Sequence, residues 1–233
     1  MVLIGGQAVN FWAEHYASRV PALKAEAPFT SGDLDFVGAA SLEEASRLAL
    51  ALKGTVRRPP QRHYDRSVIA AQVTYSDSSG DERDIQFLRR MCGMDVNEVI
   101  RTSIPIRPGL RVMHPVACLE SRIHNIVELP QEYDTEAGRQ QARVAILCGR
   151  EFLRDALDAG EVETVHGFNQ RIFRFARDHA RRCAASGLQP FDAVVVDPRL
   201  PEAFRTRDYP RMQRSMEHAL HRGGRDGRGG VER

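Results

Sequence analysis

The sequence predicts a mixed α/β fold of the α+β type, in which a mixed sheet is followed by a helical C-terminal part. The first half of the chain alternates short apolar runs with turn residues, whereas the part after Pro108 is rich in Ala, Leu, Arg and Glu at helical spacing. At 233 residues the chain is long enough for one large domain or two small ones. We expect a first domain over 1–112, a helical domain over 113–222 and a disordered, glycine- and charge-rich tail over 223–233.

In the first domain, strands are predicted to alternate with helices and to end in a hairpin. Ser41 and Glu44 have the spacing of a capping box, and Gly54 would end the helix that they begin. The expected elements are a strand over 2–4, a helix over 7–18, a loop over 19–32, a strand over 33–38, a helix over 42–53 and hairpin strands over 67–75 and 83–88.

The second domain is predicted to be helical almost throughout. Residues 192–196 are either a late strand or part of a connection. Helices are expected over 115–128, 135–159, 161–185 and 209–221.

Composition and charge exclude several classes of protein. The net charge of +2 gives no overall field that would draw the chain to nucleic acid or membrane. The four cysteines form no Cys-x-x-Cys pair, and the histidines show no familiar ligand spacing, which argues against a zinc site and for reduced thiols. No apolar run is long enough to span a membrane, and the N-terminus lacks the basic start of a signal peptide. We therefore expect a cytoplasmic protein.

The motif with the most chemical content is a pair of carboxylates in a predicted strand. Asp33 and Asp35 are two residues apart, so both side chains point to one face while Leu34 and Phe36 point to the other. Close carboxylates repel each other, and a divalent cation is a common way to neutralise them. The glycine pair Gly5-Gly6, between a strand and a helix, offers backbone amides to a phosphate. The combination predicts phosphoryl or nucleotidyl transfer.

A third carboxylate is expected on a neighbouring strand. In the returning hairpin strand, Asp84 and Gln86 face away from Ile85 and Phe87, so Asp84 is the best candidate. Three such acids could hold two Mg²⁺ ions, with Mn²⁺ as an alternative, of which one grips a triphosphate and the other activates an acceptor hydroxyl. The competing interpretation of Asp-x-Asp is a solvated strand face or a turn cap. Ser31 could donate to a phosphate or make a local turn bond.

These motifs resemble the nucleotidyltransferase superfamily with the DNA polymerase β-like fold, in which Gly-Gly or Gly-Ser precedes a helix, Asp-x-Asp follows and a third acid lies on a later strand. The chain is most similar to the bacterial subgroup related to abortive-infection and toxin–antitoxin nucleotidyltransferases. The similar segments are the opening, with IGGQAVNFWAEHY and FTSGDLDFVG, and HPVACLESRIHNI over 114–126, which resembles the start of the helical part in that subgroup. Gly-Gly replaces the Gly-Ser of many members, so no serine is available at that point. The resemblance covers about the first 125 residues and extends to the rest only as architecture.

The resemblance implies transfer of a nucleoside monophosphate from an NTP to a hydroxyl. Asp33, Asp35 and Asp84 would be the catalytic and metal-binding residues, and Gly5, Gly6, Ser31 and Arg122 would bind the nucleotide. It also implies RNA, such as a tRNA, as a possible acceptor, and an antitoxin or other partner protein. The alternative is a non-catalytic nucleotide-binding or antitoxin-like protein that keeps the fold.

Two groups of arginines have both a functional and a plain interpretation. Arg57, Arg58 and Arg62 could hold an RNA backbone, or they could form a basic surface loop. Arg139 and Arg143 are one helical turn apart and either line the cleft or form a solvated face beside acids such as Glu136.

Overall fold

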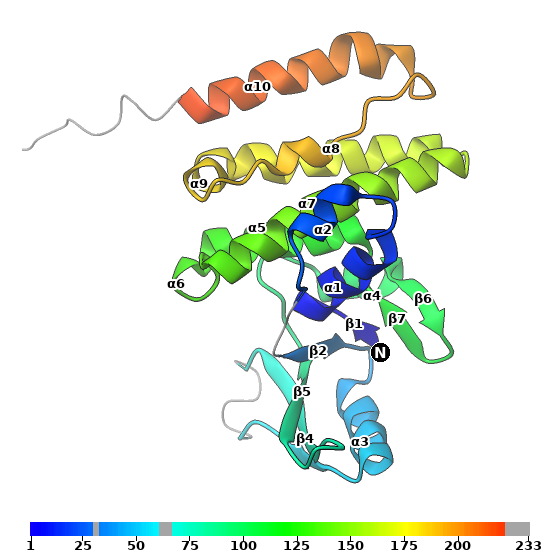
Figure 1. Cartoon of the computed structure of the whole chain (residues 1–233), viewed down its shortest axis with the longest axis vertical. Coiled ribbons are helices and arrows are strands. Elements are labelled where there is room, and N and C mark those ends of the chain that lie inside the picture. The colour runs from blue at the N-terminus through cyan, green and yellow to red at the C-terminus, as the bar shows by residue number, and fades with distance from the viewer. Residues whose placement is uncertain (30–32, 61–66, 222–233) are drawn as a thin grey trace, which may run out of the picture.

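A mixed sheet forms one end of the molecule, and helices are stacked on it in successive layers (Figure 1). The computed structural model describes residues 1–29, 33–60 and 67–221. The predicted fold class, a mixed sheet followed by a helical C-terminal part, is confirmed. The predicted disordered tail lies outside the described residues.

The sheet has seven strands in the order β3-β4-β5-β2-β1-β7-β6. Within it β1 is parallel to β7 and β2 is parallel to β5, while the other neighbours are antiparallel. The strands are β1 (Val2–Leu3), β2 (Leu34–Val37), β3 (Thr55–Arg57), β4 (Ile69–Ser76), β5 (Glu82–Leu88), β6 (Ile104–Arg107) and β7 (Leu110–Val112).

The predicted hairpin is confirmed as β4 and β5. The carboxylate of Asp77 accepts hydrogen bonds from the amides of Ser79 and Asp81, and Gly80 (φ +86°) takes the left-handed conformation that closes the turn. Val73 on β4 pairs with Ile85 on β5, and both side chains are buried. The apolar face of the hairpin is therefore fixed by the alternation of the sequence.

The helices account for most of the rest of the chain. Figure 1 shows α5, α7, α8 and α10 lying progressively farther from the sheet. The helices are α1 (Gly5–Tyr16), α2 (Pro21–Ala25), α3 (Ser41–Leu52), α4 (Val96–Thr102), α5 (Pro115–Glu128), α6 (Pro130–Tyr133), α7 (Glu136–Asp158), α8 (Val162–Asp178), α9 (Ala180–Ala185) and α10 (Tyr209–His221).

Two apolar cores hold the layers together. The smaller core lies between α3 and strands β2, β4 and β5, and it includes the stacked rings of Phe36 and Phe87. The larger core joins β1, β7 and α1 to α5, α7 and α8. Trp12 of α1 donates from its indole Nε1 to the carbonyl of Met113 across 2.8 Å. The larger core thus runs across the predicted boundary between residues 112 and 113, and that boundary itself stays a prediction.

Both ends of α3 differ from the prediction, which was a capping box at the start and Gly54 at the end. Ser41 is inside the helix and its hydroxyl donates to the carbonyl of Gly38, while Glu44 forms an ion pair with the N-terminal amine of Met1 at 2.9 Å. At the other end Lys53, not Gly54, takes the left-handed conformation (φ +56°). Gly54 is needed for a different reason: a Cβ there would lie 2.4 Å from the carbonyl oxygen of Thr74.

Two other segments differ from their predicted structure. The loop predicted over 19–32 contains the short helix α2, and the helix predicted over 161–185 divides into α8 and α9 at His179, whose backbone leaves the helical region (φ −114°, ψ 11°). Residues 192–196 were predicted to be either a late strand or part of a connection, and they are part of a connection. The side chain of buried Asn169 bonds both the amide and the carbonyl of Val195, so a helix side chain satisfies this backbone in place of a neighbouring strand.

Candidate active site

The parallel pairing of β2 with β5 brings the predicted acids to one face of the sheet. Leu34 pairs with Ile85 and Asp35 pairs with Gln86. Asp33 and Asp84 directly precede the pair Leu34–Ile85, so they lie at the same level of neighbouring strands. Because paired residues point to the same side of a sheet, Asp33, Asp35 and Asp84 share a face. The opposite face carries the apolar residues that pack on α3.

Asp35 is tightly enclosed by the start of α1. The amide of Ile4 donates to the carbonyl of Asp35 at 3.0 Å, and a Cβ placed on Gly5 would lie 2.7 Å from the Asp35 Oδ2. Gly5 also has a positive φ of +68°. Only glycine meets both conditions without strain, so this residue type is required where the backbone passes the carboxylate.

The N-terminus of α1 has no side-chain cap. Its N-cap residue is Ile4, which has no polar atom to accept from the first amides of the helix. Gly5 and Gly6 are both buried and open the helix next to Asp35. This end carries the partial positive charge of a helix terminus, which favours an anion.

Arg122 faces the acids from α5. Its side chain is only 8% exposed, one guanidinium nitrogen donates to Gln141 Oε1 at 3.0 Å, and its Cζ lies 6.0 Å from the ring centre of Tyr133 on α6. Within the part of the chain that the structure describes, its buried Nε has no hydrogen-bond partner. A buried cation with an unused donor is costly unless an anion completes its contacts.

The electrostatics of the site are dominated by Asp35. Burial and the nearby charge of Asp33 raise the pKa of Asp35 to about 6, and the attraction of Arg122 only partly opposes this rise. The ionised pair therefore destabilises the protein unless a cation binds.

Asp84 lies in a different environment. Its carboxylate is exposed and accepts a hydrogen bond from the Thr74 hydroxyl at 2.6 Å, and this bond, with one from Gln72, lowers the pKa of Asp84. Asp84 is thus ionised at neutral pH. The carboxylates of Asp33, Asp35 and Asp84 are not all within 4.8 Å of one another, so the three acids share a face without forming a closed cluster.

The donors at this site suit a hard cation. Carboxylate oxygens are the side-chain ligands that Mg²⁺ and Mn²⁺ prefer. Ser31, the remaining predicted nucleotide ligand, lies outside the described residues, as does Arg62 of the basic loop.

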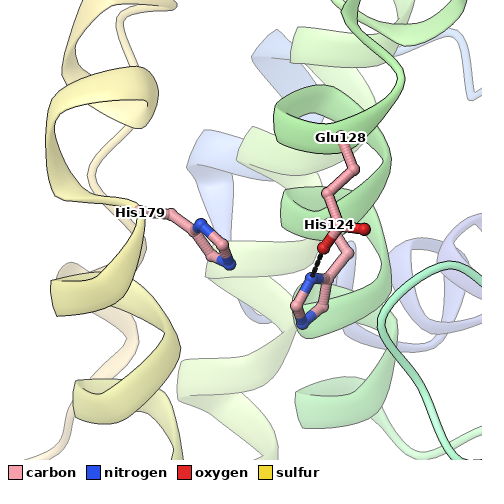
Figure 2. Close-up of side chains that lie close together, drawn as sticks. All are labelled: His124, Glu128 and His179. Carbon is pink, nitrogen blue, oxygen red and sulfur yellow. Dashed lines mark hydrogen bonds and ion pairs between the residues drawn. The ribbon is translucent and has the colours of Figure 1, made fainter.

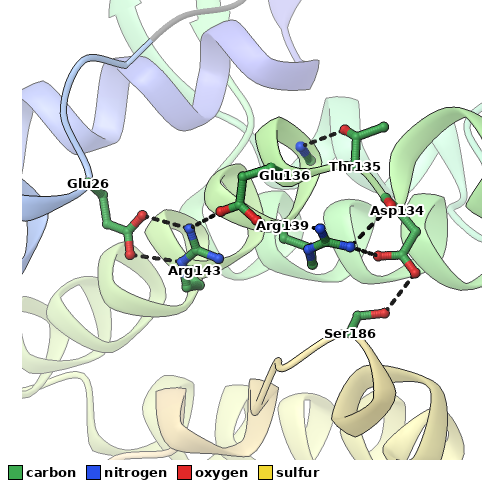
Figure 3. Close-up of polar contacts among 8 residues, drawn as sticks. Glu26, Asp134, Thr135, Glu136, Arg139, Arg143 and Ser186 are labelled. Carbon is green, nitrogen blue, oxygen red and sulfur yellow. Dashed lines mark hydrogen bonds and ion pairs between the residues drawn. The ribbon is translucent and has the colours of Figure 1, made fainter.

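Arg139 and Arg143 belong to an ion-pair network and not to this site (Figure 3). Arg139 contacts the Asp134 carboxylate at 3.0 Å, and Arg143 contacts Glu26 at 2.8 Å and Glu136 at 2.9 Å. This confirms the interpretation of a charged face beside acids. The contacts tie the end of α2 to α7.

Sequence reasoning missed one further cluster. Among the described residues, His124, Glu128 and His179 form the one group of three potential metal ligands whose donor atoms all lie within 4.8 Å of one another. A signal was present, since His124 and Glu128 are four residues apart on a helix that was predicted with its observed bounds. The third member, His179, lies 51 residues beyond Glu128 in the sequence and could not be paired with it by spacing.

Comparison with known proteins identifies no family. A scan against protein-family models finds no match, and no curated protein matches the chain. No helix within residues 1–29, 33–60 and 67–221 combines the length and apolar character needed to cross a bilayer.

Proposed function

We propose that this chain is a metal-dependent nucleotidyltransferase that moves a nucleoside monophosphate from an NTP to a hydroxyl acceptor. The observation that carries the proposal is the register of β2 against β5, which aligns Asp33 with Asp84 next to Asp35 on one sheet face. The motif resemblance required these acids on neighbouring strands, and a position of Asp84 on the opposite face would have ruled it out.

The electrostatic cost of the acid pair supports a binding role. Burial and Asp33 hold the pKa of Asp35 well above its ordinary value, so the ionised site costs stability in the absence of a cation. A plain solvated strand face carries no such cost. A carboxyl whose pKa is perturbed by burial together with a specific charged neighbour marks a candidate functional site.

The residues present fit the proposed metal and nucleotide. Asp33 and Asp35 would hold both Mg²⁺ ions, and Asp84 would complete the second site. Bound there, the ions would neutralise the triphosphate and activate the acceptor hydroxyl. Gly5 and Gly6 would direct the first amides of α1 to the β- and γ-phosphates, and the unused Nε of Arg122 would donate to a phosphate oxygen. The contribution of the protein is positioning and charge complementarity.

The acceptor is proposed from the motif resemblance alone. The motif resemblance suggests RNA, such as a tRNA, together with a toxin-like role and an antitoxin partner. Small hydroxylated molecules and protein hydroxyls are alternative acceptors. Growth arrest on expression, relieved by a neighbouring gene, would support the toxin-like role, and unimpaired growth would favour modification of a metabolite.

The test of the proposed activity is incubation of the full chain with each labelled NTP, Mg²⁺ and total cellular RNA. A separate reaction omits the RNA, so that the protein itself is the only macromolecular acceptor. We expect label to appear in one acceptor fraction. The variants Asp33→Asn and Asp35→Asn should each lower transfer by roughly 100-fold or more, because the cation loses an anionic ligand. Asp81→Asn is the matched control, since Asp81 is an exposed turn residue of the β4–β5 hairpin.

Two results would contradict the assignment. Transfer that survives both substitutions, or that proceeds after chelation of all divalent metal, would show that these acids are not the catalytic centre. NTP binding by calorimetry without turnover on any acceptor would favour the alternative, a nucleotide-binding protein that keeps the fold.

A further inference from the structure

A second cluster of ligand-type side chains lies where α5 meets the junction of α8 and α9 (Figure 2). His124 and Glu128 come from α5, and His179 lies between α8 and α9. His124 Nδ1 is 2.7 Å from Glu128 Oε1, and the rings of His124 and His179 are 5.1 Å apart at 79°. Each of the three residues offers one donor atom, and these three atoms all lie within 4.8 Å of one another.

The turn that follows β5 packs closely against this cluster. Gly93 has a positive φ of +63°, and a Cβ there would lie 2.2 Å from His124 Nδ1, so the turn must have glycine at this point. The neighbouring Cys92 donates from its thiol to Glu128 Oε2 at 3.2 Å. Both oxygens of Glu128 are thus directed by neighbours, which holds the carboxylate beside the two imidazoles.

We propose that His124, Glu128 and His179 form a binding site for a divalent transition metal, with Zn²⁺ as the ion of choice and water as a fourth ligand. Two imidazoles and one carboxylate are a recurrent zinc donor set. Bound zinc holds its donors about 2.0–2.2 Å from the metal, which places tetrahedral donors roughly 3.3–3.6 Å from one another. The three donor atoms already lie within 4.8 Å of one another, so small side-chain adjustments reach this spacing, including an opening of the 2.7 Å contact between His124 Nδ1 and Glu128 Oε1. The ion would take the place of the hydrogen bond between His124 and Glu128.

The surroundings of the cluster determine which cations it accepts. Arg171 is neutralised by Glu98 and Glu120, and Arg177 pairs with Asp178. Further positive charge comes from arginines that line the neighbouring pockets: Arg174, Arg181, Arg182, Arg211 and Arg214. One carboxylate in such a setting holds Mg²⁺ or Ca²⁺ poorly, because those ions depend on several charged oxygens. Zn²⁺, Co²⁺ and Ni²⁺ bind imidazole nitrogen strongly and tolerate this environment better.

The site is open to solvent on two sides. Glu128 and His179 line a pocket of about 1020 Å³, and His124 and His179 line another of about 330 Å³. An ion can therefore enter without unfolding the helices. Once bound, it would join α5 to the α8–α9 junction.

The experiment uses the untagged full chain, stripped of metal with a chelator and titrated with ZnCl₂ against a chromophoric competitor. We expect one Zn²⁺ per chain with a Kd of about 1 µM or tighter, and millimolar Mg²⁺ should not compete. Co²⁺ substitution should give the visible absorption of a low-coordinate site. His179→Ala and Glu128→Gln should each weaken binding by at least about tenfold.

Two control variants locate the bound ion. His218→Ala removes an exposed histidine that lines the larger pocket but is not part of the cluster, and it should leave the affinity unchanged. Asp35→Asn should also leave it unchanged, which separates this site from the proposed active site. Glu128→Gln preserves side-chain size and is partly exposed, so it remains informative if His179→Ala is unstable.

The proposal is overturned if the wild-type chain binds Zn²⁺ no more tightly than about 100 µM. It is equally overturned if folded His179→Ala and Glu128→Gln keep the wild-type affinity. A loss of affinity in Asp35→Asn would place the ion at the acidic face of the sheet instead.

Discussion

Asp35 shows how a single side chain can connect stability to function. It lies against the backbone of Gly5 and two residues from Asp33, and the charge of Arg122 partly offsets the repulsion between the two acids. A carboxyl whose pKa is raised in the folded state binds its proton more tightly there than in the unfolded chain. As pH rises from about 4 to about 6, the unfolded chain loses this proton before the folded protein does, so the stability of the fold falls over this range.

Asp35→Asn should consequently stabilise the metal-free protein. At pH 8 with a chelator present, we expect a gain of about 1–3 kcal/mol in the free energy of unfolding, because the amide keeps the shape and removes the charge. Near pH 4, where the wild-type carboxyl is itself protonated in the folded state, the gain should disappear. Urea unfolding at the two pH values measures the difference. A variant that is no more stable than wild type at pH 8 would contradict the electrostatic account, and Asp81→Asn serves as the control.

At the scale of a helix, the start of α5 depends on a buried histidine. His114 Nδ1 accepts from the amide of Ala117 at 3.2 Å, and the ring packs against Phe152 and Phe168. Burial, together with the nearby charge of Arg171, lowers the pKa of His114 to about 3. Since the unfolded chain would bind a proton near pH 6.5, acidification from 6.5 to 3 favours unfolding.

His114→Asn should weaken this acid sensitivity. Asparagine is a good N-cap acceptor and does not titrate, so the variant keeps the cap while it loses packing against the two phenylalanines. We expect lower stability at pH 7, and a difference from wild type that narrows by about 1.4 kcal/mol per pH unit as pH falls below 6.5. Urea unfolding of both proteins at pH 7 and pH 4.5 provides the test. Parallel losses in the two proteins would show that His114 is not the titrating group.

At the scale of the whole molecule, the sheet and the helical part share one core. The buried residues of α1, among them Val9, Trp12 and Tyr16, belong to the same apolar cluster as Leu119 of α5 and Leu153 of α7. The division at residue 112 therefore marks a change in architecture, while the burial of apolar surface is continuous across it.

A fragment of residues 1–112 should accordingly fail to fold by itself. Removing α5 and α7 would expose the apolar face of α1, and the remaining small core under α3 buries little surface. We expect weak circular dichroism without a cooperative melt, whereas the chain of residues 1–221 should unfold in a single calorimetric transition. A fragment with sharp proton resonances and a cooperative melt would show that the first part is an independent domain.

Local patterns predicted the elements that have a strong period. The alternation in 83–88 and the helical spacing in 115–128 both gave the observed structure, the second with its observed bounds. Short elements such as α2, β3 and β7 were missed because so few residues cannot show a period. The capping box failed because Glu44 is drawn to the amine of Met1, a partner that lies outside the local sequence.

The sequence by itself determined which residues each strong element presents to a core, and so it placed Asp33 and Asp35 on the polar face of their strand. Only the tertiary structure decided what lies opposite them: the pairing of β2 with β5, the approach of Arg122 from α5, and the meeting of His124 with His179. The reason is physical, because side-chain periodicity reports local burial, whereas these contacts join residues that are distant in the chain and depend on how whole elements pack.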